Sequence, residues 1–219
     1  MIQDTRVRNS FRNRSRLAGI VEPKVALGLP TLVSNATAYD TATVPVPAGT
    51  INGDLLVACS GTRNGVVTTA SGWTRISHND AYTSEWNDIH IKMAFNEPAS
   101  YTFPLSAGQV SWVVLAFRGS GSAVLGTNWV AGGTLVPPSA CMRGGVYIAV
   151  TCDANSGTHI TEHTGLVCAG SIVNSNASVF VSYLVPTDNI GTYGNYVLNA
   201  NPGYDGTASV GFGSRFYRP

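Results

Sequence analysis

The segment DIHIKMAFN, residues 88–96, contains the alternation that decides the fold. Its large apolar side chains occupy every second position: Ile89, Ile91, Met93 and Phe95. A period of two residues is typical of a half-buried β-strand, whereas a helix repeats about every 3.6 residues. The segment therefore predicts a strand that turns one face towards a core.

Similar short runs, rich in β-branched and aromatic residues, follow one another along the chain. They are GDLLVACS (53–60), QVSWVVLAFRG (109–119), GGVYIAVTC (144–152), ASVFVSYLVP (177–186), YGNYVLNA (193–200) and TASVGFGSRFY (207–217). Segments dense in turn formers separate them, and no stretch sustains a helical period. In TVPVPAG, residues 43–49, two prolines lack amide donors, so this piece can only be an edge strand. We predict an all-β protein: an antiparallel β-sandwich over residues 31–219, jelly-roll-like with a double Greek key.

The body also suggests an internal repeat. The series that starts at Gly53 and ends at Arg118 can be laid beside the series that starts at Gly144 and ends at Arg218. Each holds an apolar strand, a middle strand and a closing aromatic strand. Any all-β chain offers matches of this kind, so chance similarity stays open as the alternative.

Composition separates a basic arm from a sparsely charged body. Of all residues, 44% are hydrophobic and 11% charged, against about 25% charged in ordinary soluble domains. Residues 1–30 carry a net charge of +4, and residues 31–219 carry −3. No apolar run reaches the ~18 residues of a membrane helix, so a membrane span is excluded.

The arm is interpreted as a docking segment. Five arginines and one phenylalanine are spread along it: Arg6, Arg8, Phe11, Arg12, Arg14 and Arg16. Such an arm fits an acidic protein surface, with apolar side chains as additional contacts. A solvated tail and an organelle transit peptide are the alternatives. A nucleic-acid partner is not expected, because no aromatic stacking platform accompanies the arginines.

The residues that flank each cysteine and tryptophan predict whether its side chain is buried. Four cysteines with no zinc spacing predict free thiols in a reducing compartment. Cys59, Cys152 and Cys168 lie in apolar runs and are expected to be buried, whereas Cys141 follows a proline-rich stretch and is expected to be exposed. Trp73, Trp112 and Trp129 are expected in the core.

The most enzyme-like string is His159-Ile-Thr-Glu162-His163, the H-x-x-E-H pattern of inverted zinc proteases. A helix would bring the two histidines together, but the flanking glycines and β-branched residues favour a strand, which holds them ~13 Å apart. No nucleophile elbow or phosphate-binding loop occurs. We expect no enzyme, no catalytic residue, no metal and no cofactor.

Aromatic side chains near turns could instead bind a sugar ring: Tyr82, Trp86, Tyr193 and Tyr204. The alternative is that these rings pack over the ends of the sandwich or into a subunit contact, where Tyr and Trp are common.

An ordered series of motifs resembles a β-sandwich domain of bacteriophage structural proteins. The series is PAGTINGDLLVACS (47–60), SGWTRIS (71–77), IKMAFNEPASYTF (91–103), VVLAFRG (113–119) and a closing strand that ends in Arg-Pro. Such domains occur in capsid decoration, head-fibre and tail-fibre proteins. The segment HITEHTGLVCAG, residues 159–170, departs from this pattern.

The resemblance implies a non-enzymatic virion protein that decorates or cements a capsid. Its partner would be the major capsid protein, contacted through the arm, on the outside of particles assembled in the host cytoplasm. Because few surface charges keep copies apart, we also expect self-association, with a homotrimer as the first expectation and a dimer as the second. The alternative is a receptor-binding or glycan-binding module of a tail fibre or head fibre, with a host surface glycan as ligand.

Overall fold

The computed structural model describes residues 28–82, 85–131, 135–153, 163–174, 177–187, 190–197 and 206–214. None of these residues is helical, and they form fourteen strands. The strands are β1 (Thr31–Tyr39), β2 (Thr43–Pro45), β3 (Leu55–Arg63), β4 (Thr74–Tyr82), β5 (Glu85–Met93), β6 (Ser100–Thr102), β7 (Gln109–Arg118), β8 (Ser120–Ala131), β9 (Ser139–Cys141), β10 (Tyr147–Asp153), β11 (Val167–Ile172), β12 (Ser178–Leu184), β13 (Gly191–Tyr193) and β14 (Gly206–Ser214).

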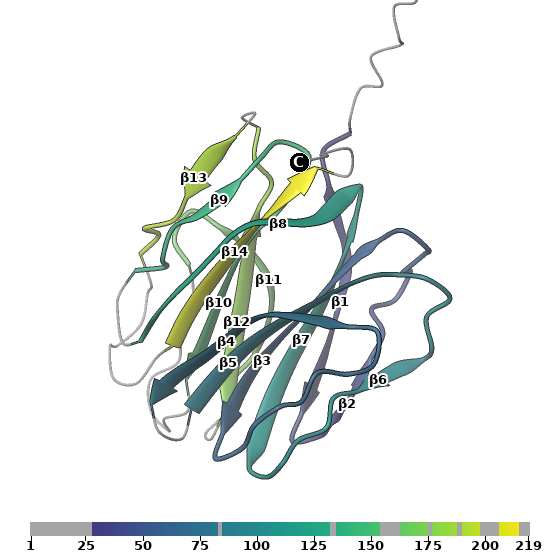
Figure 1. Ribbon diagram of the computed structural model, residues 1–219, viewed down its shortest axis with the longest axis vertical. Helices are drawn as coiled ribbons and strands as arrows, with labels where there is room; N and C mark the ends of the chain where they lie inside the picture. Colours follow the sequence, from purple (N-terminus) through teal and green to yellow (C-terminus); the bar gives the residue numbers. More distant parts are fainter. Residues whose placement is uncertain are drawn as a thin grey trace, which may run out of the picture.

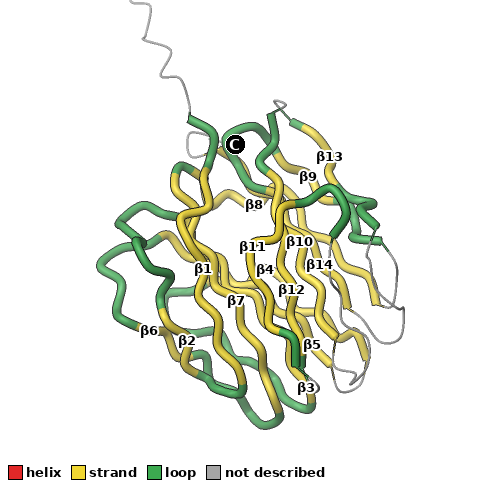
Figure 2. The backbone as a smooth tube through the Cα atoms, turned by 180° about the vertical axis from the view of Figure 1, so that it is seen from behind, coloured by secondary structure: helices red, strands yellow, loops and turns green. Residues whose placement is uncertain are grey.

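Two antiparallel five-stranded sheets pack face to face (Figure 1). The first has the order β1-β7-β3-β5-β4, and the second has the order β11-β12-β10-β14-β8. Strand β3 lies over β10, β1 over β11 and β4 over β8, and Figure 2 shows β1 and β11 side by side at one edge. The predicted β-sandwich is confirmed. The finer jelly-roll assignment is not confirmed, because each sheet takes its five strands from one half of the chain.

The core between the sheets comes from strict alternation along the central strands. On β5, Ile89, Ile91 and Met93 point into it as their spacing predicts, whereas Phe95 lies beyond the strand and is 71% exposed. The same face of the first sheet adds Leu55, Val57, Cys59, Val113, Leu115 and Phe117, and the second sheet adds Val146, Ile148, Val150, Val179, Val181, Ala208, Val210 and Phe212. Apolar burial on this scale is the dominant stabilising term of a sandwich.

The two halves of the chain have the same strand plan. Adding seven to each strand number of the first sheet gives the order of the second, β8-β14-β10-β12-β11. The two-stranded sheet β2–β6 lies with the first five-stranded sheet, and its counterpart β9–β13 lies with the second, at opposite sides of the molecule (Figure 1). The internal repeat is therefore present in the structure.

Strand register extends the match to single residues. Leu55 faces Phe117 across β3–β7, and the Phe212 amide donates to the Val146 carbonyl at the equivalent place in β10–β14. Phe117 thus corresponds to Phe212, so Arg118 corresponds to Gly213. The sequence comparison had matched Arg118 with Arg218, which was wrong.

Irregularities also recur in both halves. Strand β4 has a register shift between Arg75 and Ser77, and β11 has one between Cys168 and Gly170. A glycine with positive φ precedes each, Gly72 at 79° and Gly165 at 85°. Within this chain, the segment HTGLVCAG (163–170) is therefore the counterpart of ASGWTRIS (70–77). Bulges at equivalent positions bend the two edge strands alike.

The outer face of each sheet carries its own smaller core. In the first half it includes Trp112, Phe103 and Trp73, and in the second half it is centred on Tyr147. Burial of Trp73 and Trp112 is confirmed, but the prediction for Trp129 was wrong, since this residue is 40% exposed on edge strand β8.

Some other local expectations need correction. All four cysteines are free, as expected, but Cys141 is buried and Cys168 is exposed on edge strand β11, the reverse of the prediction. The run 193–200 was predicted as a strand, yet β13 ends at Tyr193, and Asn195 has a φ of 57° that suits a turn. Residues 43–49 do contain the expected edge strand, β2.

Candidate functional site

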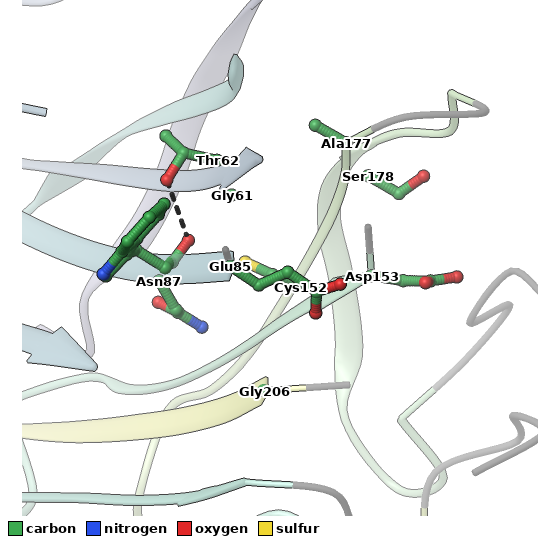
Figure 3. A pocket seen from close by; sticks show the side chains of 10 residues that line it. Gly61, Thr62, Glu85, Asn87, Cys152, Asp153, Ala177, Ser178 and Gly206 are labelled. Atoms are coloured by element: carbon green, nitrogen blue, oxygen red, sulfur yellow. Dashed lines mark hydrogen bonds between the residues drawn. The ribbon is translucent and has the colours of Figure 1, made fainter. Parts of the chain in front are cut away.

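A polar pocket lies between the sheets, where the apolar core ends (Figure 3). Five strands contribute to its lining: Gly61 and Thr62 of β3, Glu85, Trp86 and Asn87 of β5, Cys152 and Asp153 of β10, Ser178 of β12 with the preceding Ala177, and Gly206 of β14. Its free space is about 230 Å³, part of which is open solvent. We call it the inter-sheet pocket.

The backbone of the two sheets approaches closely at this pocket. A Cβ atom at Gly61 would lie 2.8 Å from the Ser178 carbonyl oxygen and 2.9 Å from the Cys152 sulfur. Gly206 and Ala177 are also small. The remaining space is therefore left for the longer side chains of β5, which Figure 3 shows extending towards the second sheet.

Asn87 is the most unusual side chain of the pocket. It shares the inward face of β5 with Ile89, and it is 1% exposed. Neither its amide nitrogen nor its amide oxygen has a hydrogen-bond partner among the described residues. A buried polar group left without a partner costs about 1–3 kcal/mol, so such groups in native proteins usually contact an ion or a water molecule.

Two carboxyl groups share the pocket with Asn87. Burial, together with the negative charge of Asp153, raises the pKa of Glu85 to about 7. Arg63, which faces Glu85 across β3–β5, acts in the opposite direction and lowers this pKa. Asp153 itself is 2% exposed. The negative charge of Asp153 is thus close enough to disfavour the charged form of Glu85.

A second polar cluster lies on β4 and β5. The Nδ1 atom of His78 lies 2.7 Å from Oδ1 of Asp88, and Nη1 of Arg75 lies 3.6 Å from the same oxygen. Burial raises the pKa of Asp88, although both neighbours lower it. A histidine oriented by a carboxylate is half of a nucleophile-activating system, but Ser60, opposite Asp88 in the register, is completely buried and out of reach of a substrate.

His163 of the H-x-x-E-H string lies in the interior of the second half. Its Nε2 atom is 2.8 Å from the Thr151 hydroxyl, and its ring packs edge-on against Phe180. Burial lowers its pKa to about 4. His159 and Glu162 lie outside the described residues. Within the described ranges, no three His, Cys, Asp or Glu side chains gather as a metal-binding group.

The aromatic residues considered for sugar binding are not brought together where they are described. Trp86 is half-buried on β5 of the first sheet. Tyr193 of β13 packs beside Tyr147 on the outer side of the second sheet, with ring centroids 6.2 Å apart. Outside the description lie the Tyr82 side chain, Tyr204 and the arm residues Arg6, Arg8, Phe11, Arg12, Arg14 and Arg16.

An exposed apolar surface follows the edge of the second sheet. Strand β8, SGSAVLGTNWVA, is twelve residues long and contains no charged residue. It pairs with β14 on one side only, and it exposes Val124, Trp129 and Val130 by 36–40%. We call this strand with its three exposed side chains the β8 edge. Long uncharged edge strands are templates for pairing with another chain.

Sequence reasoning missed the residues of the inter-sheet pocket. A signal was nonetheless present: Glu85 and Asn87 continue the inward alternation of Ile89, Ile91 and Met93, so the register of one strand places two polar groups at core positions. Contact with Asp153, sixty-eight positions further along the chain, depends on the stacking of the sheets and has no sequence signal.

No described helix is long and apolar enough to cross a membrane. Comparison with protein families, with curated proteins and with solved structures found no match for this chain.

Proposed function

We propose that this chain is a non-enzymatic structural protein of a virus particle, which decorates or cements the capsid. Its arm, residues 1–30, would dock on the major capsid protein, and its sandwich would contact further copies of itself. The proposal rests on the ordered motif series of residues 47–119 and on one structural observation, the β8 edge.

The β8 edge supports self-association because it is the end strand of its sheet and exposes three apolar side chains. An isolated soluble sandwich usually protects a long edge with lysine, proline or a covering segment. The β8 edge has neither lysine nor proline, and its side chains Trp129 and Val130 lie on opposite faces of the strand. A neighbouring copy could add a strand here and bury both side chains.

The packing of the sandwich also favours contacts through edges. Both faces of each sheet are engaged, one in the inter-sheet core and the other in an outer cluster. Little sheet surface is left for a broad face-to-face contact, so an assembly would form through edge strands, loops and the arm.

The experiment measures binding to phage particles that lack the chain, together with oligomeric state by light scattering. The full chain should form a homo-oligomer, a trimer first, and bind the particles. Val130→Lys should shift the chain towards a monomer, because a charge at a β-pairing edge opposes docking. Val66→Lys, a comparably exposed valine of the first half, is the control and should leave the oligomer intact.

Deletion of residues 1–24 in the same assay should leave a folded sandwich that no longer binds particles. If the full chain is a monomer at micromolar concentration and does not bind particles, the proposal is wrong. Specific glycan binding by such a monomer would instead support the fibre-module alternative.

A further inference from the structure

Two loops at one end of the first sheet carry exposed apolar side chains. Residues 46–54 link β2 to β3, and residues 94–99 link β5 to β6. We call them the loop pair. Ile51 of the first loop is 54% exposed, and Phe95 of the second is 71% exposed, the largest exposed fraction among the described large apolar side chains. Because single exposed apolar residues are common, the setting of these two decides whether they bind anything.

Hydrogen bonds join the two loops directly behind these side chains. Oδ1 of Asn52 accepts the Asn96 amide at 2.7 Å, and Nδ2 of Asn52 donates to Oδ1 of Asn96 at 3.3 Å. Ile51 and Phe95 each precede one member of this asparagine pair, so their backbones are fixed close together. Binding through fixed loops loses little conformational entropy.

Ion pairs neutralise the charged groups of the loop pair. Asp54 accepts the Ile51 amide at 3.0 Å, and its two oxygens accept from Arg118, each at 3.1 Å. Glu97, the acid of the second loop, binds Lys92 at 2.8 Å. The loop pair therefore presents apolar tips on a base whose charges cancel.

The internal repeat shows that the fold does not require Phe95. Lys92 of β5 and Leu184 of β12 occupy equivalent register positions. Three residues further on, Phe95 corresponds to Thr187, which is also exposed. The second half therefore folds with a small polar side chain at this position.

The loop that carries Ile51 is likewise an addition of the first half. Nine residues link β2 to β3, whereas five residues link β9 to β10. The positions of Asp54 and Arg118 hold Gly145 and Gly213 in the second half, so the ion pair that fixes the longer loop has no counterpart there. The strand plan thus needs neither the length of this loop nor its ion pair.

The arm joins the sandwich beside the loop pair. Thr31, the first residue of β1, pairs with Arg118 in the register of β1 and β7. Nη2 of Arg118 donates to the Gly49 carbonyl of the first loop at 3.0 Å. Arg16 precedes Thr31 by fifteen residues, which span at most about 50 Å. A surface that binds the arm is therefore within reach of the loop pair.

The chemistry of the loop pair favours a protein surface over a lipid surface. Apolar groups that enter anionic membranes are commonly accompanied by lysines and arginines that attract the lipid headgroups. Here Lys92 and Arg118 are both engaged with acids. A phenylalanine on a fixed, neutral base suits a pocket in a protein, as aromatic anchors of interfaces do.

We propose that Ile51 and Phe95 insert into an apolar hollow of the protein surface on which the arm docks, as a second contact with the same partner. The arm would supply charge attraction and reach, and the loop pair would supply a fixed apolar anchor. The inference rests on the proposed function, because it takes the arm-binding capsid surface as the partner.

The test measures association and dissociation rates of the full chain on phage particles that lack it. Phe95→Thr, which installs the residue of the second half, should weaken binding about tenfold, mostly through faster dissociation. Ile51→Asn should act in the same direction but by less. Val173→Asn is the matched control and should bind like the wild type, because Val173 is 53% exposed but lies near Ser178 at the opposite end of the sandwich. All three variants should keep the wild-type melting temperature, since the changed side chains are exposed.

Salt separates the loop contact from the arm contact. Replacing Arg12 and Arg14 by alanine should flatten the salt dependence of binding, because salt screens charges. Phe95→Thr should lower the affinity by the same factor at low and high salt, because the lost contact is apolar.

Three outcomes would contradict the proposal. Wild-type binding that Phe95→Thr and Ile51→Asn leave unchanged would overturn this inference alone and leave the proposed function standing. A wild-type chain that does not bind particles would overturn both. Binding to vesicles of phosphatidylcholine and phosphatidylglycerol that is lost in Phe95→Thr would assign the loop pair to a lipid surface instead.

Discussion

The first half of the sandwich, residues 31–119, and the second half, residues 120–214, share a strand order but not a set of side chains. Glycine turns, bulge positions and inward apolar alternation recur in both. The outer clusters differ, since Trp73 in the first half corresponds to Leu166 in the second. The comparison shows that turns, bulges and alternation specify this fold, whereas the size of each buried side chain can vary if neighbouring positions compensate.

The largest effect should come from the paired phenylalanines of the inter-sheet core. Phe117 and Phe212 occupy equivalent positions and are both fully buried. Replacing either by alanine should lower the free energy of unfolding by about 3–5 kcal/mol. Urea unfolding of Phe117→Ala and Phe212→Ala should give similar losses in one cooperative transition. A loss confined to one variant would show that the two halves differ energetically.

A smaller effect should separate the two outer clusters. Trp73 is buried and packs edge-on against Tyr101 and Phe103, with ring centroids 4.9 and 5.2 Å away, whereas Leu166 is only partly buried. Trp73→Ala should therefore cost about 3 kcal/mol and Leu166→Ala about 1–2 kcal/mol. The same unfolding assay measures the difference, and equal losses would contradict the view that the first outer cluster is the better packed.

The most gradual effect concerns acid sensitivity. Burial lowers the pKa of His90 in the first half to about 3 and that of His163 in the second half to about 4. Between these values and the ordinary 6.5, the unfolded chain binds protons that the folded chain does not. Stability therefore falls as pH falls through this window, by at most about 1.4 kcal/mol per pH unit for each histidine.

The pKa of Glu85, raised to about 7, has the opposite effect, because its stabilisation is lost as pH rises from about 4.5 to 7. The informative quantity is thus the difference in pH dependence of stability between the wild type and a variant that lacks one buried histidine. Urea midpoints measured from pH 4.5 to 7 should show a shallower acid loss in His163→Gln than in the wild type. Parallel curves would mean that His163 becomes protonated without unfolding.

Alternation along single strands made the fold class predictable. The sequence of β5 shows its inward face directly, since Ile89, Ile91 and Met93 are evenly spaced. Strand β4 was missed because TRISHNDAY is rich in His, Asn and Asp, which favour turns in isolation. Tertiary pairing with β5 overrides that local preference.

Burial at edges and contacts between sheets could not be predicted in the same way. Cys168 and Trp129 lie in apolar sequence but on edge strands, where exposure depends on what covers the edge. Likewise, the approach of Glu85 to Asp153 depends on how two separate sheets stack. Local sequence patterns contain neither kind of information.

Because each sheet is drawn from one contiguous half of the chain, the order of synthesis matters. Residues 31–119 leave the ribosome first and can complete every strand pairing of their own sheet. Until residues 120–214 follow, the apolar face of Leu55, Val113 and Phe117 has no covering sheet. A nascent first half therefore exposes an apolar face that can associate with other chains before its own second half is made. Slow translation near residue 120 would prolong this exposure and favour swapped dimers over the monomeric sandwich.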